Sequence, residues 1–257
     1  MHKDSFVGTI TVAAILCIVC SVFVSTASVK LRPIQKKNKL LDLKKNILIA
    51  ADMYQDGVDI ENEFKKIDAR LVDLATGEYV EGDVTSFDQR KSAKDPKTNL
   101  MIPSEQDFAD IKMRSKVAPV YLVKADDGSL KSLVVPMHGL GLWSIMYGFL
   151  AIDGDLNTVK GITFYEHGET PGLGGEVDNP KWKGIWPGKL LNNKNGELAL
   201  TVIKGTVVTA NNPNAQHQVD GMAGATITSR GVANMVQYWL GDTGFGKYFD
   251  KLAAGGS

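Results

Sequence analysis

The stretch Asp220–Ser229 combines two glycines and two alanines with a cluster of hydroxyl side chains, and it leads directly into a predicted helix. The helix is predicted from Thr226 to a stop at Gly241, because apolar residues recur at helical spacing: Ile227, Val232, Met235, Val236, Trp239 and Leu240. The first N–H groups of a helix lack internal partners and lie at the positive end of the helix dipole, which favours an anion there by ~0.3–1 kcal/mol. The pattern predicts a phosphate site at Thr226, and its plain structural alternative is a capped helix after a flexible turn.

A second glycine-rich stretch, His167–Gly175, reads HGETPGLGG. Its proline fixes one backbone dihedral, and the glycines that follow permit positive φ and a close approach of the backbone to a flat ligand. The alternative is an ordinary surface loop after a strand that ends near Tyr165. The candidate ligand-binding residues of this loop are Glu169, Thr170, Gly172, Leu173 and Gly174.

Together the two stretches resemble the flavin-binding motifs of the C subunits of the Na+-translocating NADH:quinone oxidoreductase, which carry covalent FMN. The related Rnf electron-transport complexes contain subunits with the same FMN-binding domain. In that family the threonine after Gly-Ala carries FMN through a phosphodiester bond, and the matching residues here are Gly224, Ala225 and Thr226. The family's usual Ser or Thr two places before that alanine is Ala223 in this chain, which leaves the acceptor itself unchanged. Two further hydroxyls compete as acceptors and rank below Thr226: Thr228 and Ser229.

The resemblance extends to the surroundings of the flavin ring. Gly139–Trp143 is similar to a family stretch that supplies an aromatic side chain near the flavin. Because an isoalloxazine ring needs apolar surfaces as well as polar anchors, we expect Trp143 and Leu173 to be ring neighbours. Lys204 matches a basic family position close to the flavin, where a cation would stabilise an anionic reduced ring. The structural alternatives are that Trp143 belongs to the hydrophobic core and that Lys204 is a solvated residue at the end of a strand.

Composition narrows the class of protein. The chain has 257 residues, long enough for one substantial domain and an anchor. Its 29 basic residues balance its 29 acidic residues, so the overall charge does not suggest nucleic-acid binding.

The N-terminal segment predicts a membrane anchor within residues 1–29. Phe6–Val29 contains no charged side chain, and as a helix it would extend ~36 Å, enough to cross a ~30 Å hydrocarbon layer. The alternative is a cleaved secretory signal, but the apolar run exceeds the ~7–15 residues usual for such a signal. Cys17 and Cys20 both lie in this segment, where we interpret them as small apolar residues rather than as a redox pair.

The orientation of the anchor presents a conflict. Basic residues follow the apolar segment in excess, and the positive-inside rule applied alone would place the large domain in the cytoplasm: Lys30, Arg32, Lys36, Lys37, Lys39, Lys44 and Lys45. The resemblance implies the opposite side, a single-pass protein of the bacterial inner membrane with a periplasmic soluble domain. We follow the resemblance, because the basic run also fits a predicted amphipathic helix over Pro33–Met53.

The remaining pattern predicts an α+β fold: a single transmembrane helix, then a domain with a largely antiparallel sheet. We predict that Asp59 is the N-cap of a helix that runs to about Arg70, and that a turn lies at Thr76–Gly77. A long polar, irregular segment is expected over Phe87–Arg114. The predicted hairpin pairs residues 120–124 with 132–135, and further strands are expected at 144–152, 159–165 and 197–203. We divide the soluble part into a helical and irregular region over residues 30–115 and the FMN-binding domain over residues 116–257.

These observations predict a flavoprotein subunit that relays electrons within a complex that oxidises NADH, reduces ubiquinone and exports Na+. The resemblance implies other membrane and flavin subunits as partners, and a flavin transferase for maturation. NADH itself is not expected to bind, because the chain lacks a GxGxxG that follows a strand and opens a helix. The alternatives are the FMN subunit of the Rnf ferredoxin:NAD complex, an envelope hydrolase with a Thr or Ser nucleophile, and a noncovalent FMN-binding module.

Overall fold

The structure is a computed structural model that describes residues 6–207 and 211–255. The chain divides into two compact units, Met1–Leu43 and Lys44–Ser257. The finer division of the soluble part at residue 115 stays a prediction.

The first unit consists of the greater part of helix α1 (Phe6–Ala50). This helix is long and apolar enough to cross a membrane, with an 18-residue window of mean hydropathy 2.6. The predicted separation into two helices near Pro33 was wrong, because α1 continues through that proline. An interior proline costs ~3 kcal/mol, but no glycine occurs between Gly8 and Gly57 to act as a second helix breaker beside Pro33.

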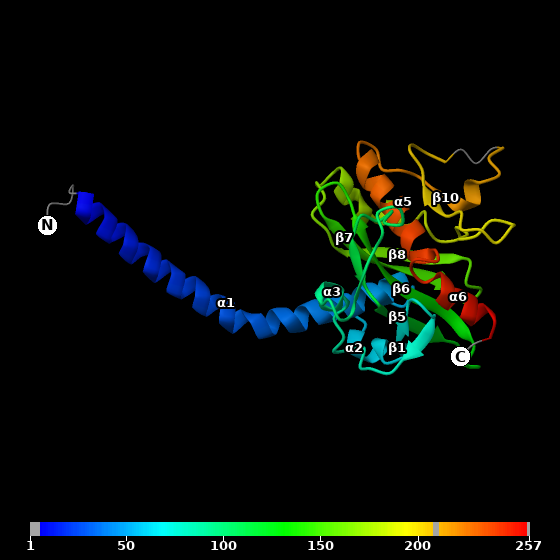
Figure 1. Ribbon diagram of the computed structural model, residues 1–257, viewed down its shortest axis with the longest axis horizontal. Helices are drawn as coiled ribbons and strands as arrows, with labels where there is room; N and C mark the ends of the chain where they lie inside the picture. Colours follow the sequence, from blue (N-terminus) through cyan, green and yellow to red (C-terminus); the bar gives the residue numbers. More distant parts are fainter. Residues whose placement is uncertain (1–5, 208–210, 256–257) are drawn as a thin grey trace. The chain divides into compact units, whose positions relative to one another are not determined.

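The second unit is built on a six-stranded antiparallel sheet with the strand order β2-β1-β5-β6-β7-β8 (Figure 1). Its strands are β1 (Ile67–Asp73), β2 (Glu78–Val80), β5 (Val117–Lys124), β6 (Leu130–Leu140), β7 (Ile145–Asp153) and β8 (Val159–Glu166). The predicted hairpin and the two strands after it are therefore confirmed, as is the α+β class.

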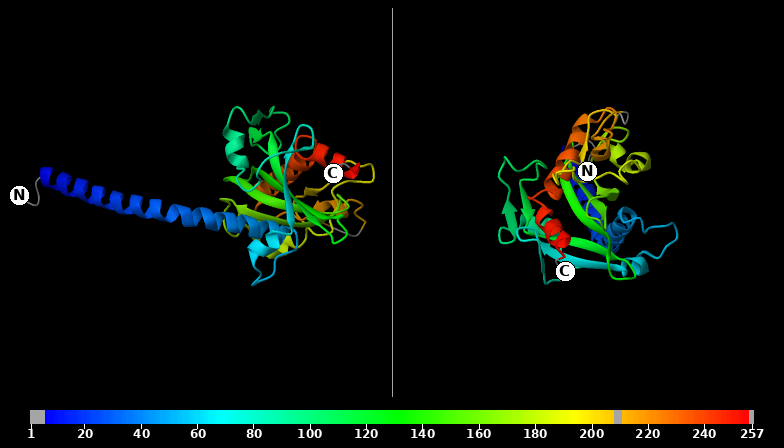
Figure 2. Two further views of the ribbon diagram at one scale, coloured as in Figure 1. Left: turned by 90° about the horizontal axis from the view of Figure 1, so that it is seen from below. Right: turned by 90° about the vertical axis from the view of Figure 1, so that its right-hand side faces the viewer.

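Both faces of this sheet are buried, each by different helices. On one face, Leu133, Ile162 and the other side chains of that face join a core with α5 (Thr226–Leu240) and α6 (Gly246–Ala253), which lie on the same side of the sheet in Figure 2. On the other face the end of α1 packs against β8, where the Thr163 hydroxyl donates to the Asn46 carbonyl over 3.3 Å. Alternate side chains of a strand point to opposite faces, which explains the near-continuous apolar sequence of these strands.

Helix α5 is held close to β6 by a glycine and by a tryptophan. The backbone at Gly231 lies against the Leu140 carbonyl, where any side chain would collide with backbone atoms. Nearer its C-terminal end, the Trp239 indole N–H donates to the His138 carbonyl over 2.7 Å. The predicted start at Thr226 and the stop at Gly241 are both confirmed.

The other predicted elements were partly right. Asp59 caps α2 (Ile60–Phe64), but that helix ends well before Arg70, because the residues from Ile67 onward pair as strand β1 with β5. The turn at Thr76–Gly77 is present, and Gly77 has the positive φ it requires. The expected excursion contains α3 (Gln89–Lys94), β3 (Asn99–Met101) and β4 (Met113–Ser115).

The segment between β8 and α5 has little regular structure. It contains two 3-10 turns, η1 (Gly174–Asp178) and η2 (Ala215–His217), and the short helix α4 (Pro180–Lys183). The strand expected over residues 197–203 is reduced to β9 (Thr201–Val202), which pairs in parallel with β10 (Gln218–Val219).

Candidate cofactor site

Three segments that are distant in sequence meet at one end of the sheet. The turn of residues 141–144 joins β6 to β7, and the loop 167–175 leaves β8, whose last residue Glu166 pairs with Tyr147 near the start of β7. Helix α5 lies against the end of β6 at Gly231, so its first turn extends toward the same place. The antiparallel order of neighbouring strands therefore brings both predicted glycine-rich stretches and the Trp143 turn together.

The carboxylate of Glu169 joins these three segments. Its oxygens accept backbone N–H groups of the turn: Leu142 at 3.0 and 3.1 Å, Trp143 at 2.9 Å and Ser144 at 3.3 Å. The Thr228 hydroxyl, on α5, donates to Oε2 over 2.5 Å. Glu169 is only 5% exposed, so its carboxylate is engaged in bonds inside the protein, and the ligand contact expected of it stays a prediction.

The electrostatics of Glu169 follow from these bonds. Burial alone would raise the pKa of its carboxyl, but the hydrogen bonds from Thr228 and the turn N–H groups outweigh burial and lower that pKa. A lowered pKa in the folded state means that the ionised carboxylate stabilises the fold at neutral pH, and that this contribution is lost as the pH falls through the folded pKa. The Glu169 side chain is therefore a charged hydrogen-bond acceptor at neutral pH.

The three hydroxyls of Thr226, Thr228 and Ser229 have different surroundings. Thr226 is exposed at the first position of α5, and no side chain caps that helix among the described residues. Thr228 is 1% exposed and its hydroxyl is hydrogen-bonded to Glu169. Ser229 is 3% exposed and its hydroxyl accepts the Met222 N–H over 2.9 Å. Of the three, only the Thr226 hydroxyl is accessible to a ligand.

Apolar side chains at the site are exposed to a degree that is unusual for their size. We call this group the apolar rim: Leu142, Trp143, Leu173 and Ile227, which are 45%, 69%, 45% and 53% exposed. The Leu173 side chain lies over Gly224, where an added Cβ would be 3.0 Å from Leu173 Cδ2. Gly224 also has a φ of +73°, which favours glycine. Trp143 and Leu173 were candidates from the sequence, whereas Leu142 and Ile227 were missed.

The remaining predicted residues also lie on or next to these segments. Thr170 and Gly172 are exposed in the loop, and the Thr170 carbonyl accepts the N–H groups of Leu173 and Gly175. Lys204 is exposed. It lies beside the segment that leads to α5, because the carbonyl of its neighbour Gly205 accepts the Gly221 N–H over 2.8 Å. The sequence missed Ser144, whose hydroxyl accepts the Gly168 N–H over 2.6 Å and ties the loop to the turn.

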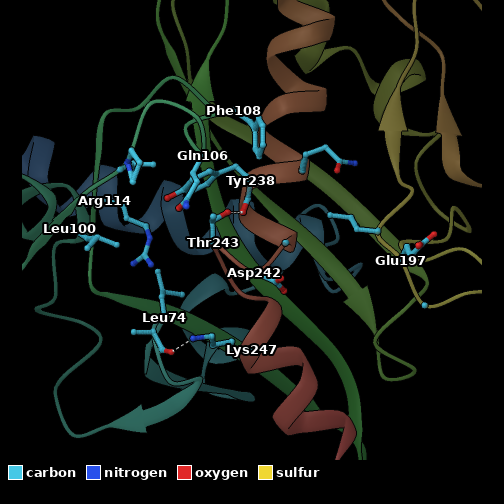
Figure 3. A pocket seen from close by; sticks show the side chains of 17 residues that line it. Leu74, Leu100, Gln106, Phe108, Arg114, Glu197, Tyr238, Asp242, Thr243 and Lys247 are labelled. Carbon is cyan, nitrogen blue, oxygen red and sulfur yellow. Dashed lines mark hydrogen bonds between the residues drawn. The ribbon is translucent and has the colours of Figure 1, made fainter.

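A separate hollow of about 880 Å³ lies at the opposite end of α5 (Figure 3). Its walls include Arg114, Tyr238 and Thr243, and the predicted site residues, all of which are described, are not among its lining residues. The candidate cofactor site is consequently an exposed surface around Thr226 and not this hollow.

Comparison with known proteins connects this surface to a family. Residues 141–241 match the family described as the FMN-binding domain, a range that contains all three converging segments. The chain is 49% identical to the C subunit of the Na+-translocating NADH-quinone reductase of Haemophilus ducreyi, over 98% of this chain and 96% of that protein. It is 47% identical to the corresponding protein of Pseudomonas aeruginosa, over 99% and 98% of the two chains.

A solved structure agrees with the sequence relatives. The crystal structure of NqrC from Shewanella oneidensis superimposes with a TM-score of 0.78 at 39% identity, and the match covers 85% of this chain and 99% of that one. A crystal structure of the C subunit from Parabacteroides distasonis matches with a TM-score of 0.66 at 31% identity. The likenesses run along nearly the whole length of the relatives, which confirms the predicted family: this chain belongs to the C subunits of the Na+-translocating NADH-quinone reductases.

Proposed function

We propose that this chain carries FMN in a phosphodiester bond to Thr226 and relays electrons within a membrane complex that oxidises NADH, reduces ubiquinone and exports Na+. The relatives are named as C subunits of a Na+-translocating NADH-quinone reductase, so the chain works with the other subunits of such a complex. The single observation that carries the covalent part of the proposal is the exposed Thr226 hydroxyl, next to two hydroxyls that are buried and already hydrogen-bonded.

The residues of the site fit FMN in both polarity and shape. The first N–H groups of α5 and the positive φ of Gly224 suit a phosphate close to the backbone. The apolar rim offers flat and aliphatic surface to a ring, and the exposed Lys204 adds a positive charge beside the segment that leads to α5. Bound FMN supplies the electron-transfer chemistry, while the protein's residues attach, orient and electrostatically tune it.

Other steps of the overall reaction belong to other subunits. The described part of the chain has one helix that could span a membrane, and one helix does not form an ion path. No GxGxxG in the sequence follows a strand and opens a helix, so NADH oxidation also requires a partner protein. The role of this chain is electron transfer between partners.

The attachment is expected to need a separate flavin transferase. Among the described residues no histidine is hydrogen-bonded to the hydroxyls of Thr226, Thr228 or Ser229. The only described carboxylate that is, Glu169, bonds the buried Thr228 and not Thr226, so no base in the site activates the Thr226 hydroxyl. Full-length chain produced with a flavin transferase should give a fluorescent band after denaturing electrophoresis, and chain produced without the enzyme should give none. A fluorescent band in both preparations would contradict this requirement.

The same observations argue against a hydrolase. Burial, and secondarily Arg90, lower the pKa of His138 to about 3, so that its ring is neutral. The His167 ring bonds Asp178 over 2.8 Å and the Glu169 N–H over 3.2 Å, and the His217 ring lies 3.0 Å from the Leu190 carbonyl. A nucleophile with a base held by a third group is not formed by these residues.

We place the large domain on the periplasmic side of the inner membrane, despite the lysines that follow the anchor. The family resemblance implies attachment by a transferase in the cell envelope, and such attachment requires the start of α5 to be exposed there. Alkaline phosphatase fused after Ser257 should be active, and a fluorescent protein that folds only in the cytoplasm should be dark at the same position. A bright fluorophore with inactive phosphatase would reverse the topology and agree with the positive-inside rule.

A further inference from the structure

We infer that Glu169 is a positioning residue that fixes the Trp143 turn relative to the Thr226 attachment point. This inference rests on the proposed function, because it concerns the geometry in which attached FMN would meet the apolar rim. Glu169 is assigned no contact with the flavin itself. Its role is carried out through Trp143 on one side and Thr228 on the other.

The first argument is the division of hydrogen bonds between the two carboxylate oxygens. Oε1 accepts the N–H groups of Leu142, Trp143 and Ser144, whereas Oε2 accepts the Thr228 hydroxyl and shares the Leu142 N–H. One oxygen is therefore directed mainly to the turn and the other to α5. Thr228 lies two residues after Thr226 on the same rigid helix, so the carboxylate links the ring-contacting turn to the helix that bears the attachment point.

The second argument is that glycines make the room for this carboxylate. A Cβ added at Gly141 would lie 2.5 Å from Oε1, and a Cβ added at Gly174 would lie 2.7 Å from Oε2 and 2.5 Å from Thr228 Oγ1. Neither glycine has a positive φ, so backbone conformation does not explain them. Close packing around Glu169 does explain them, which accounts for one glycine in the Trp143 turn and one in the loop.

The third argument is the charge. Among the described residues the Glu169 carboxylate has no Lys, Arg or His ion-pair partner, and it is 5% exposed. A buried carboxylate of this kind depends on its hydrogen-bond donors, and here those donors are the turn N–H groups and the Thr228 hydroxyl. Displacing the turn would remove the N–H donors, and displacing α5 would remove the Thr228 donor, so either movement costs the buried charge part of its hydrogen bonding.

Four substitutions, two at Glu169 and two at Thr228, distinguish the hydrogen bonds of the Glu169 side chain from its negative charge. Glu169→Ala removes both links, whereas Glu169→Gln keeps an oxygen for the turn and offers an amide N–H to Thr228 Oγ1. Thr228→Val cuts only the link to α5, and Thr228→Ser restores the hydroxyl. Glu176→Ala is the matched control, since this half-buried carboxylate of the neighbouring η1 bonds Asn179 over 2.5 Å instead of the turn.

The test uses the full-length chain in detergent after treatment with flavin transferase, and it has three readouts. Amide hydrogen exchange of residues 142–144 reports the turn, intact mass reports attachment, and the visible circular dichroism and midpoint potential of the flavin report ring position. In Glu169→Ala we expect exchange at residues 142–144 to be about tenfold faster or more, the factor that matches loss of a hydrogen bond to a charged group. The added mass should persist, and the dichroism and potential should shift.

The threonine pair keeps the test decisive if Glu169→Ala does not fold. Thr228→Val should shift the flavin dichroism and potential, Thr228→Ser should restore both, and Glu176→Ala should change neither. Glu169→Gln should retain slow exchange at residues 142–144. Unchanged exchange and dichroism in Glu169→Ala, or a Thr228→Val chain equal to the unsubstituted chain, would overturn the positioning role. Absence of the FMN mass from the unsubstituted chain would instead refute the proposed function. Amide exchange at residues 142–144 would still test whether Glu169 holds the turn.

Discussion

A Thr226→Val chain is expected to lose covalent FMN completely while it folds normally. Valine has nearly the shape of threonine but lacks the hydroxyl that would form the phosphodiester bond. Because Thr226 is exposed at the first position of α5, the free energy of unfolding should change by no more than about 0.5 kcal/mol. Flavin fluorescence after denaturing electrophoresis measures the loss, and thermal unfolding verifies the fold.

Thr226→Ser is the matched control for this substitution. It keeps a hydroxyl at the same place, so covalent flavin should be retained at least in part. The neighbouring hydroxyls are not expected to replace Thr226, because both are buried and hydrogen-bonded. A Thr226→Val chain that still fluoresces after denaturation would contradict the assignment and point to another acceptor.

Gly174→Val is expected to destabilise the domain and to disturb the flavin while leaving it attached. The new Cβ would press against Thr228 Oγ1 and the Glu169 carboxylate, at 2.5 and 2.7 Å in the unrelaxed geometry. Overpacking of this kind typically costs about 1–3 kcal/mol. Thermal unfolding should show a lower Tm, and the flavin absorption and dichroism should shift, but the added mass should remain on the chain.

Gly172→Asn provides the comparison within the same loop. An added Cβ at Gly172 meets no described atom within 4 Å, and asparagine tolerates its φ of +76° better than most residues. This variant should keep nearly the original Tm and flavin spectrum. If Gly174→Val behaves like Gly172→Asn, the loop is a surface connection and does not order the site.

Local sequence patterns predicted the helices and strands whose ends are set by apolar spacing, capping residues and glycines close in sequence. Helix α5 has a regular apolar spacing and a glycine after its last turn, and both of its predicted ends were right. The helix expected from Asp59 to Arg70 failed in its second half, because pairing of β1 with β5 outweighs helix propensity there. The break expected at Pro33 was also wrong: α1 continues through this proline, which has no glycine beside it to help end the helix.

The candidate site was predictable in its motifs but not in its connections. Thr226 and the loop around Gly174 follow from residue types and spacing, and from the family resemblance. The bond between Glu169 and Thr228 spans 59 residues of sequence, and only the order of β6, β7 and β8 brings its partners together. No local pattern predicts such a contact, so the sequence did not reveal the buried bond between Glu169 and Thr228.

The most direct test of the covalent FMN proposal is peptide mapping of the chain purified from its native membrane. Trypsin should release the fragment Gly205–Arg230, which contains all three candidate hydroxyls. We expect this fragment to carry the mass of FMN less one water, with the fragment-ion series locating the addition at Thr226. The same mass on Thr228, on Ser229 or on a different peptide, or an unmodified fragment in an active complex, would contradict the account.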